Sequence, residues 1–182
     1  MAWVAAVLVL GLPAAAFAEA PATIFGSATP ATINSGDIHS VVLGVKFSSE
    51  VAGSVTGIRF YKATANTGTH IGSLWSASGT LLGSATFAKE TASGWQQVSF
   101  ATPVAIAAHT TYVASYLAPK GDYSDTASGF AAAGVSNPPL TALANSTSAN
   151  GVYAYSATNT FPTSAYKATN YWVDVDFVPT PT

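Results

Sequence analysis

Residues 171–177 read YWVDVDF, and this stretch decides the fold class. Apolar and polar side chains alternate with a period of two, which is the repeat of a β-strand that has one face on a core. We expect one face to carry Tyr171, Val173, Val175 and Phe177, and the other to carry Trp172, Asp174 and Asp176. A shift by one residue would bury both aspartates, so the register is well specified.

The same alternation recurs in short runs separated by Gly, Pro, Asn and Ser. These runs are residues 41–47, 57–61, 70–75, 80–87, 95–100, 110–117 and 152–156. The best helical candidate, residues 136–146, begins with two close prolines and allows one or two turns at most. The pattern therefore predicts an all-β fold, an antiparallel β-sandwich of jelly-roll type with about 8–9 strands and one long loop region, residues 118–170.

The first twenty residues are MAWVAAVLVLGLPAAAFAEA. An apolar run, a proline and a small-residue A-x-A pattern at 16–18 are typical of a secretory signal peptide. The run is shorter than the roughly 20 residues that span a bilayer. We expect a signal peptide at 1–18, an N-terminal arm at 19–35, a single sandwich domain at 36–178 and a tail at 179–182.

Composition restricts the classes of function. The 182 residues include six basic and eight acidic side chains and no cysteine, and charged residues make up 8% of the chain, against about 25% in average soluble domains. Nucleic acid is therefore not an expected partner, and cysteine-based metal centres and thiol nucleophiles are excluded. We expect no membrane insertion after signal cleavage. A neutral surface of Thr, Ser and Asn suits neutral polar ligands such as glycans.

Three stretches carry a family resemblance: residues 42–53 (VLGVKFSSEVAG), residues 55–116, which contain GIRFYK and NTGTHIGSLW, and residues 161–177. They resemble the bacterial extracellular family called domain of unknown function 4082. The resemblance implies a β-sandwich module of secreted or surface proteins, found beside immunoglobulin-like repeats and carbohydrate-active domains. It implies no catalytic residues.

The residues themselves do not predict an enzyme. None of the three histidines has a metalloprotease spacing, and no G-x-S-x-G elbow is present. Asp174 and Asp176 share one strand face, with Cα atoms roughly 6.5–7 Å apart. Two carboxylates on the same side of a sugar suit neither geometry of glycoside hydrolysis.

Calcium is the cofactor that this sequence would accommodate, because calcium is bound by carboxylate and carbonyl oxygens. Asp37 could meet Asp174 or Asp176 where the first and last strands pair. Asp122 and Asp125 of the GDYSD loop form a second candidate group. The alternative for both groups is a solvated loop with Asx turns.

Flat aromatic rings beside polar groups are the candidate ligand contacts. The candidates are Arg59, Tyr61, His70, Trp75, Trp95, Tyr123 and Trp172. We expect NTGT (66–69) to be a tight hairpin turn with Asn66 and Gly68 at positive φ, which would let Tyr61, His70 and Trp75 form one exposed platform. The long loop region, which holds Tyr123, also contains Tyr153, Tyr155 and Tyr166. The alternative is that each ring covers a sheet and keeps one polar atom in water.

The first hypothesis is therefore a secreted or cell-surface, non-catalytic module that binds a glycan or similar neutral polymer through exposed rings in a groove. The alternative is a structural or adhesive envelope subunit that acts by self-association or by contacts with other proteins, for which an exposed sheet edge or apolar patch is expected. A third hypothesis, a hydrolase, requires carboxylates that face each other across a cleft.

Overall fold

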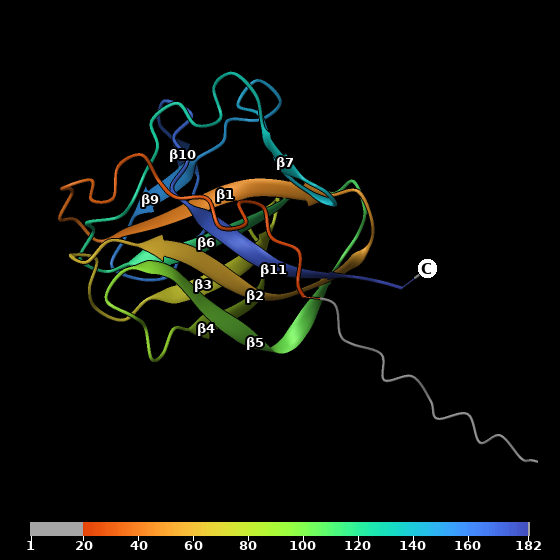
Figure 1. The fold of residues 1–182 in the computed structure, drawn as a ribbon, viewed down its shortest axis with the longest axis horizontal. Helices are drawn as coiled ribbons and strands as arrows, with labels where there is room; N and C mark the ends of the chain where they lie inside the picture. Colours follow the sequence, from red (N-terminus) through yellow and green to blue (C-terminus); the bar gives the residue numbers. More distant parts are fainter. Residues whose placement is uncertain (1–19, 182) are drawn as a thin grey trace, which may run out of the picture.

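The computed structural model describes residues 20–181 as strands and loops, without a helix in that range (Figure 1). The predicted signal peptide, residues 1–18, lies outside the described residues. Across residues 20–181, nothing helical has the length and apolar character needed to cross a membrane. The strands are β1 (Val41–Ser49), β2 (Gly53–Lys62), β3 (Ile71–Ser76), β4 (Leu81–Thr86), β5 (Gly94–Ile106), β6 (Tyr112–Ala118), β7 (Val135–Asn137), β8 (Leu140–Ala142), β9 (Val152–Tyr155), β10 (Ser164–Ala165) and β11 (Val173–Pro179).

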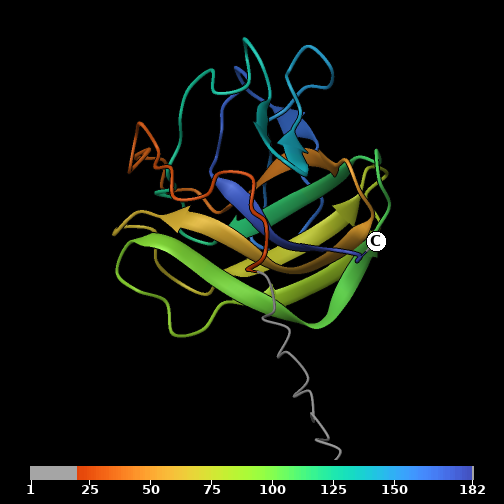
Figure 2. The ribbon, with the colours of Figure 1, turned by 45° about the vertical axis from the view of Figure 1, so that its right-hand side comes forward.

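The strands form two antiparallel sheets, which confirms the predicted β-sandwich. The larger sheet has the order β10-β9-β1-β6-β3-β4, with β8 also paired to β1 and β7 paired to β8. The smaller sheet has the order β11-β2-β5, and Figure 2 shows β2 and β5 of this sheet side by side. Most of the long loop region projects beside β1, on the side of the sandwich where β9 and β10 lie (Figure 1).

The core lies between the sheets and follows the predicted alternation. Val41, Leu43, Val45 and Phe47 of β1 are buried together with the phenylalanines that strand parity assigned to the core, Phe60, Phe87, Phe100 and Phe177. Phe60 of the smaller sheet stacks on Tyr116 of the larger one, with ring centroids 4.1 Å apart. Burial of large aromatic side chains is a strong contribution to stability, and it joins the two layers here.

The predicted NTGT hairpin is wrong. Strand β2 belongs to the smaller sheet and β3 to the larger, so residues 63–70 cross between layers. Gly68 has the expected positive φ of 106°. Asn66 is absent from the positive-φ residues of the described chain, and its buried side chain hydrogen-bonds Tyr116. The turn at 76–79 does join two paired strands, β3 and β4, as predicted.

Two further segments differ from their predictions. Residues 136–146 contain the β7–β8 hairpin instead of helical turns. At the other end, Val173 pairs with Phe60 and starts the regular strand β11, because Trp172 has a φ of 55°. The predicted alternation is therefore confirmed from Val173 onward. Tyr171 and Trp172, which were predicted to belong to the same strand, lie before it.

Candidate ligand-binding site

The N-terminal arm covers the outer face of the smaller sheet. Ala22 pairs with Phe177 at the edge of β11. The backbone N–H groups of Ile24 and Phe25 donate to the Asp174 carboxylate at 2.7 and 3.1 Å. Asp174 was predicted to face solvent, and this is wrong because the arm lies over it and leaves its side chain 0% exposed.

Arg59 and Trp95 also bind the arm. The Arg59 guanidinium donates to Gly26 O at 3.0 Å and lies 3.7 Å from an Asp174 oxygen. It also stacks over the Trp95 ring at 4.4 Å, and Trp95 Nε1 donates to Ala28 O at 3.0 Å. Both side chains, predicted as ligand contacts, therefore have their polar atoms engaged by the protein's own backbone.

An aromatic cluster completes this surface. Phe25 packs 5.2 Å from Trp172 and 6.5 Å from Trp95, measured between ring centroids. Trp172 Nε1 donates to Thr126 Oγ1 at 2.9 Å, and Tyr61 meets Trp95 edge-on at 5.6 Å. We call this group the arm cluster; its members are Phe25, Arg59, Tyr61, Trp95, Trp172 and Asp174. It contains four of the predicted ligand residues, and it serves to dock the arm.

Asp176 lies beside the arm cluster and is 4% exposed. Its Oδ2 is the one buried side-chain oxygen or nitrogen without a hydrogen-bond partner among residues 20–181. Burial raises the pKa of Asp176 to about 6; the Arg59 charge opposes this shift and the Asp174 charge adds to it. Burial also raises the pKa of Asp174, against the hydrogen bonds from the arm.

His70 is a scaffold residue. Its ring is 0% exposed, and its nitrogens lie 2.8 Å from Glu90 Oε1 and 2.8 Å from the side-chain amide of Asn66. Lys62 Nζ donates to the same Glu90 carboxylate at 2.7 Å. Burial lowers the pKa of His70, and the Glu90 carboxylate opposes that shift. This network fixes the crossover at residues 63–70.

Trp75 lies on the outer face of the larger sheet, 6% exposed, with its ring 5.7 Å from Phe161 and its Nε1 donating to Ser115 Oγ. Tyr61 lies on the outer face of the smaller sheet. The predicted platform of Tyr61, His70 and Trp75 is therefore wrong: the three rings occupy one outer face, the core and the opposite outer face.

A different group of rings surrounds a cavity at the open side of the sandwich. We call it the tyrosine cleft; its members are Tyr123, Tyr153, Tyr155, Tyr166 and Tyr171. The cavity holds about 230 Å³, and Val41 and Leu43 complete its lining.

The position of the cleft follows from the sheet pairing. Tyr153 and Tyr155 of β9 pair with Leu43 and Val41 of β1, so they project on the core side of the larger sheet. The smaller sheet ends at β11, whereas the larger one continues through β9 to β10. The inner face is therefore left open at β9, where Tyr153 and Tyr155 lie.

The rings of the cleft stand nearly perpendicular to one another. Tyr123 and Tyr171 are 5.6 Å apart at 84°, and Tyr153 and Tyr171 are 6.4 Å apart at 72°. Tyr153 and Tyr155 continue the series at 5.7 Å and 75°. Edge-to-face contacts of this kind are favourable and hold each ring in place.

Asp37 fixes the most exposed of these rings. Tyr155 is 60% exposed, yet its hydroxyl donates to Asp37 Oδ2 at 2.7 Å. The His39 backbone N–H and Nδ1 lie 3.0 and 2.8 Å from Asp37 Oδ1. Burial raises the pKa of Asp37, but the hydrogen bonds from Tyr155 and His39 outweigh it, so the net shift is downward. The bond to Asp37 in turn raises the pKa of Tyr155 to about 12.

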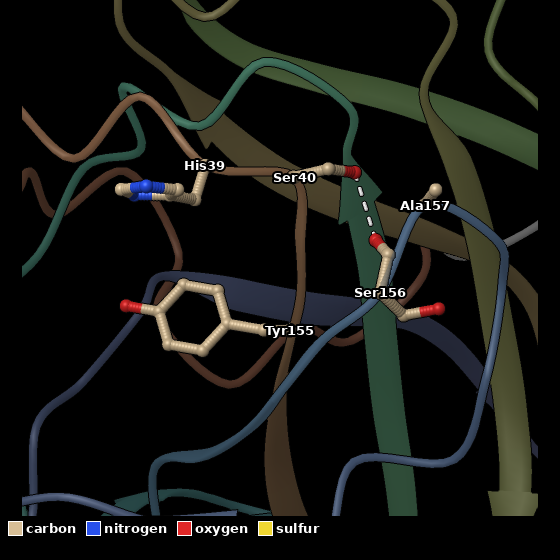
Figure 3. Close-up of a pocket in the computed structure, with 5 residues that line it drawn as sticks. All are labelled: His39, Ser40, Tyr155, Ser156 and Ala157. Carbon is tan, nitrogen blue, oxygen red and sulfur yellow. Dashed lines mark hydrogen bonds between the residues drawn. The ribbon is translucent and has the colours of Figure 1, made fainter.

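Two more open hollows adjoin the cleft. Figure 3 shows the first, lined by His39, Ser40, Tyr155, Ser156 and Ala157, with a Ser40 hydroxyl that donates to Ser156 O at 2.8 Å. The second is lined by Asp125, Lys167 and three tyrosines of the cleft, and it holds about 290 Å³. Tyr155 thus separates the first hollow from the cleft, while Tyr123, Tyr166 and Tyr171 connect the cleft to the second.

The candidate calcium ligands do not gather. Asp37 bonds His39 and Tyr155, and Asp174 bonds the arm, so the predicted meeting of these carboxylates is wrong. The Asp122 backbone N–H donates to Asp37 O, and the Asp125 backbone pairs with Thr32. Between residues 20 and 181, no three His, Asp or Glu side chains are grouped so as to hold a metal ion. Calcium binding stays a prediction.

Of the seven predicted ligand residues, only Tyr123 lies in the cleft. Sequence reasoning assigned Tyr171 to the core and left Tyr153, Tyr155 and Tyr166 unranked within the long loop region. The available signal was that four tyrosines lie in that region, which was itself the expected place for a site.

Residues 27–173 match the family model described as Domain of unknown function (DUF4082). No curated protein matches the chain. The matched range includes every strand that lines the tyrosine cleft, as well as Arg59, Trp95 and Trp172 of the arm cluster. Because the match covers most of the sequence, this protein belongs to the DUF4082 family.

Proposed function

We propose that the protein is a secreted or cell-surface, non-catalytic binding module for a glycan or similar neutral polymer, with the tyrosine cleft as its site. The observation that supports this most is Tyr155, an exposed ring whose hydroxyl is held by Asp37. A ring that is already ordered loses little conformational freedom when a ligand stacks on it. Tyr166, 54% exposed, offers a second accessible ring in the same cleft.

The Asp37 carboxylate suits binding better than catalysis. Asp37 accepts hydrogen bonds from His39, Tyr123 and Tyr155, and the downward shift of its pKa opposes a role as general acid. Its chemistry is to hold Tyr155 in position and to offer a fixed acceptor near the ligand.

The test is glycan-array binding of residues 19–182, with calcium and with a chelator. We expect Tyr155→Ala and Tyr166→Ala to weaken binding at least tenfold. Leu81→Ala is the matched control, because Leu81 is 46% exposed on β4 and does not line the cleft. Binding that survives both tyrosine substitutions would place the site elsewhere.

One observation favours the structural or adhesive alternative. Strand β4 is the edge of the larger sheet, and Leu81 and Leu82 on it are 46% and 37% exposed. An exposed apolar edge can pair with another chain. A blank array, together with a large assembly in sedimentation that Leu82→Lys disperses, would support this function in place of glycan binding.

A further inference from the structure

The tyrosine rings that line the cleft stand at steep angles to one another and do not form one flat surface. Three successive ring pairs meet at 84°, 72° and 75°. A sugar ring stacks on one flat face, whereas a compact cation is best surrounded by several ring faces, since each face carries negative charge density. We propose that the tyrosine cleft binds a quaternary or methylated ammonium group.

The lining of the cavity fits such a group. Five tyrosines and the aliphatic Val41 and Leu43 surround about 230 Å³. The tyrosine ring faces and the side chains of Val41 and Leu43 are apolar toward methyl groups, and the ring faces are electron-rich toward positive charge, which is the combination that aromatic cages use. A sugar inserted deeply into the cavity would need many hydrogen bonds from the tyrosine hydroxyl groups. Some of these hydroxyl groups already bond to the protein, as the Tyr155 hydroxyl does to Asp37.

Two carboxylates flank the rings. Asp37 lies at hydrogen-bond distance from Tyr155 and 3.5 Å from the Tyr123 hydroxyl. Asp125 lines the adjoining hollow together with Tyr123 and Tyr171. Burial first, and then the charges of Asp37 and Asp125 among others, raise the pKa of Tyr123, which keeps this phenol neutral. His39 lies 2.8 Å from Asp37, and the nearby cationic side chain is Lys167.

Lys167 shows that the cleft rings accept a cation. Its Nζ lies over the Tyr166 ring, 5.0 Å from the centroid. Tyr166 also lines the cavity, so the Lys167 ammonium competes with a ligand cation for the negative charge of this ring. Removal of the Lys167 charge should therefore tighten the binding of an ammonium ligand.

This inference shares its cleft with the proposed function and does not depend on a glycan being bound. The ammonium group could belong to a free small molecule or to a substituent on a polymer. Both sources present the same chemistry to the tyrosines, so the experiment has to distinguish them.

The test is calorimetric titration of the 19–182 protein with choline and with 3,3-dimethylbutan-1-ol, which has the same shape and no charge. We expect choline to bind at least tenfold more tightly. Tyr166→Leu should abolish this preference, whereas Tyr166→Phe, which keeps the ring, should retain it. Lys167→Ala should tighten choline binding and Asp125→Asn should weaken it.

Equal affinity for choline and the neutral alcohol, or full choline binding by Tyr166→Leu, would overturn the inference. Tyr166 is 54% exposed, so both substitutions are compatible with folding. Neutral glycan binding without choline binding would overturn the inference and support the proposed function. Choline binding together with a blank glycan array would support the inference and contradict the proposed function. Much tighter binding to trimethylammonium-substituted glycans than to free choline would identify a polymer substituent as the source.

Discussion

The arm cluster and the tyrosine cleft have similar chemistry, but the protein's own chain occupies the first and leaves the second accessible. Each combines several aromatic rings with a carboxylate that accepts hydrogen bonds. In the arm cluster, Asp174, Arg59 and Trp95 all bond to backbone groups of residues 24–28. The rings of Phe25 and Trp172 are buried, and those of Tyr61 and Trp95 are half-buried. In the cleft, Asp37 bonds tyrosine hydroxyls and leaves Tyr155 and Tyr166 accessible. Aromatic and polar composition alone therefore does not identify a site; what matters is whether the chain itself occupies it.

The largest expected effect is on the arm cluster. Asp174→Ala should lower the free energy of unfolding by about 3–5 kcal/mol, because it leaves Arg59 without its buried partner and the arm without its acceptor. Urea denaturation measures this change. Asp37→Ala is the control: it removes a carboxylate near the surface and should lower stability by about 1 kcal/mol or less. Equal losses in the two variants would contradict the distinction between the two regions.

The next prediction compares the loss of one aromatic ring from each region. Phe25→Ala should destabilise the protein by about 3–5 kcal/mol, because Phe25 is 7% exposed among Trp95, Trp172 and Phe130. Tyr155→Ala should change stability by roughly 0.5 kcal/mol, as for exposed positions in general. Thermal unfolding followed by near-UV circular dichroism checks both. A Tyr155→Ala loss as large as that of Phe25→Ala would show that the cleft is structural.

Strand parity predicted the layers of the fold well because it depends only on neighbouring residues. The core phenylalanines and the inward-facing residues of β11, which are Val173, Val175 and Phe177, followed from it. It did not predict the burial of Asp174, because residues 22–28 cover this face from 150 positions away in sequence. Nor could it place Trp75, since the loop that carries Phe161 covers it. The cleft arises where the smaller sheet ends before the larger one, which is a property of both sheets together.

Substitution of Asp176 should have an effect of intermediate size on the free energy of unfolding, and this effect should depend on pH. Its native pKa of about 6 lies above the ordinary value of 3.8. The native state therefore binds this proton more tightly than the unfolded state does, so the stability it confers is full below pH 3.8 and is lost as the pH rises through 6.

Asp176→Asn should accordingly raise stability at pH 7.5 by at most about 3 kcal/mol and leave it nearly unchanged at pH 4. Denaturation of both proteins at the two pH values measures the difference, and other titrating groups cancel in the comparison. A variant that is destabilised at pH 7.5 would mean that the ionised Asp176 has a favourable partner.

The smallest effect concerns Asp37 and Tyr155. Tyr155→Phe keeps the ring and removes its hydrogen bond to Asp37, so we expect a loss of stability no larger than that of Tyr155→Ala. Ligand affinity should fall severalfold, because the ring is no longer ordered before binding. Titration of Tyr155→Phe and Tyr155→Ala separates the two contributions: similar affinities would show that orientation by Asp37, and not the ring itself, dominates.

The most direct test of the account compares binding and stability in Tyr166→Ala and Trp75→Ala, with whichever ligand the array or the choline titration identifies. The account predicts that Tyr166→Ala keeps the wild-type Tm and loses binding, whereas Trp75→Ala lowers Tm and binds normally while folded. Loss of binding in Trp75→Ala at unchanged Tm, with wild-type affinity in Tyr166→Ala, would contradict it.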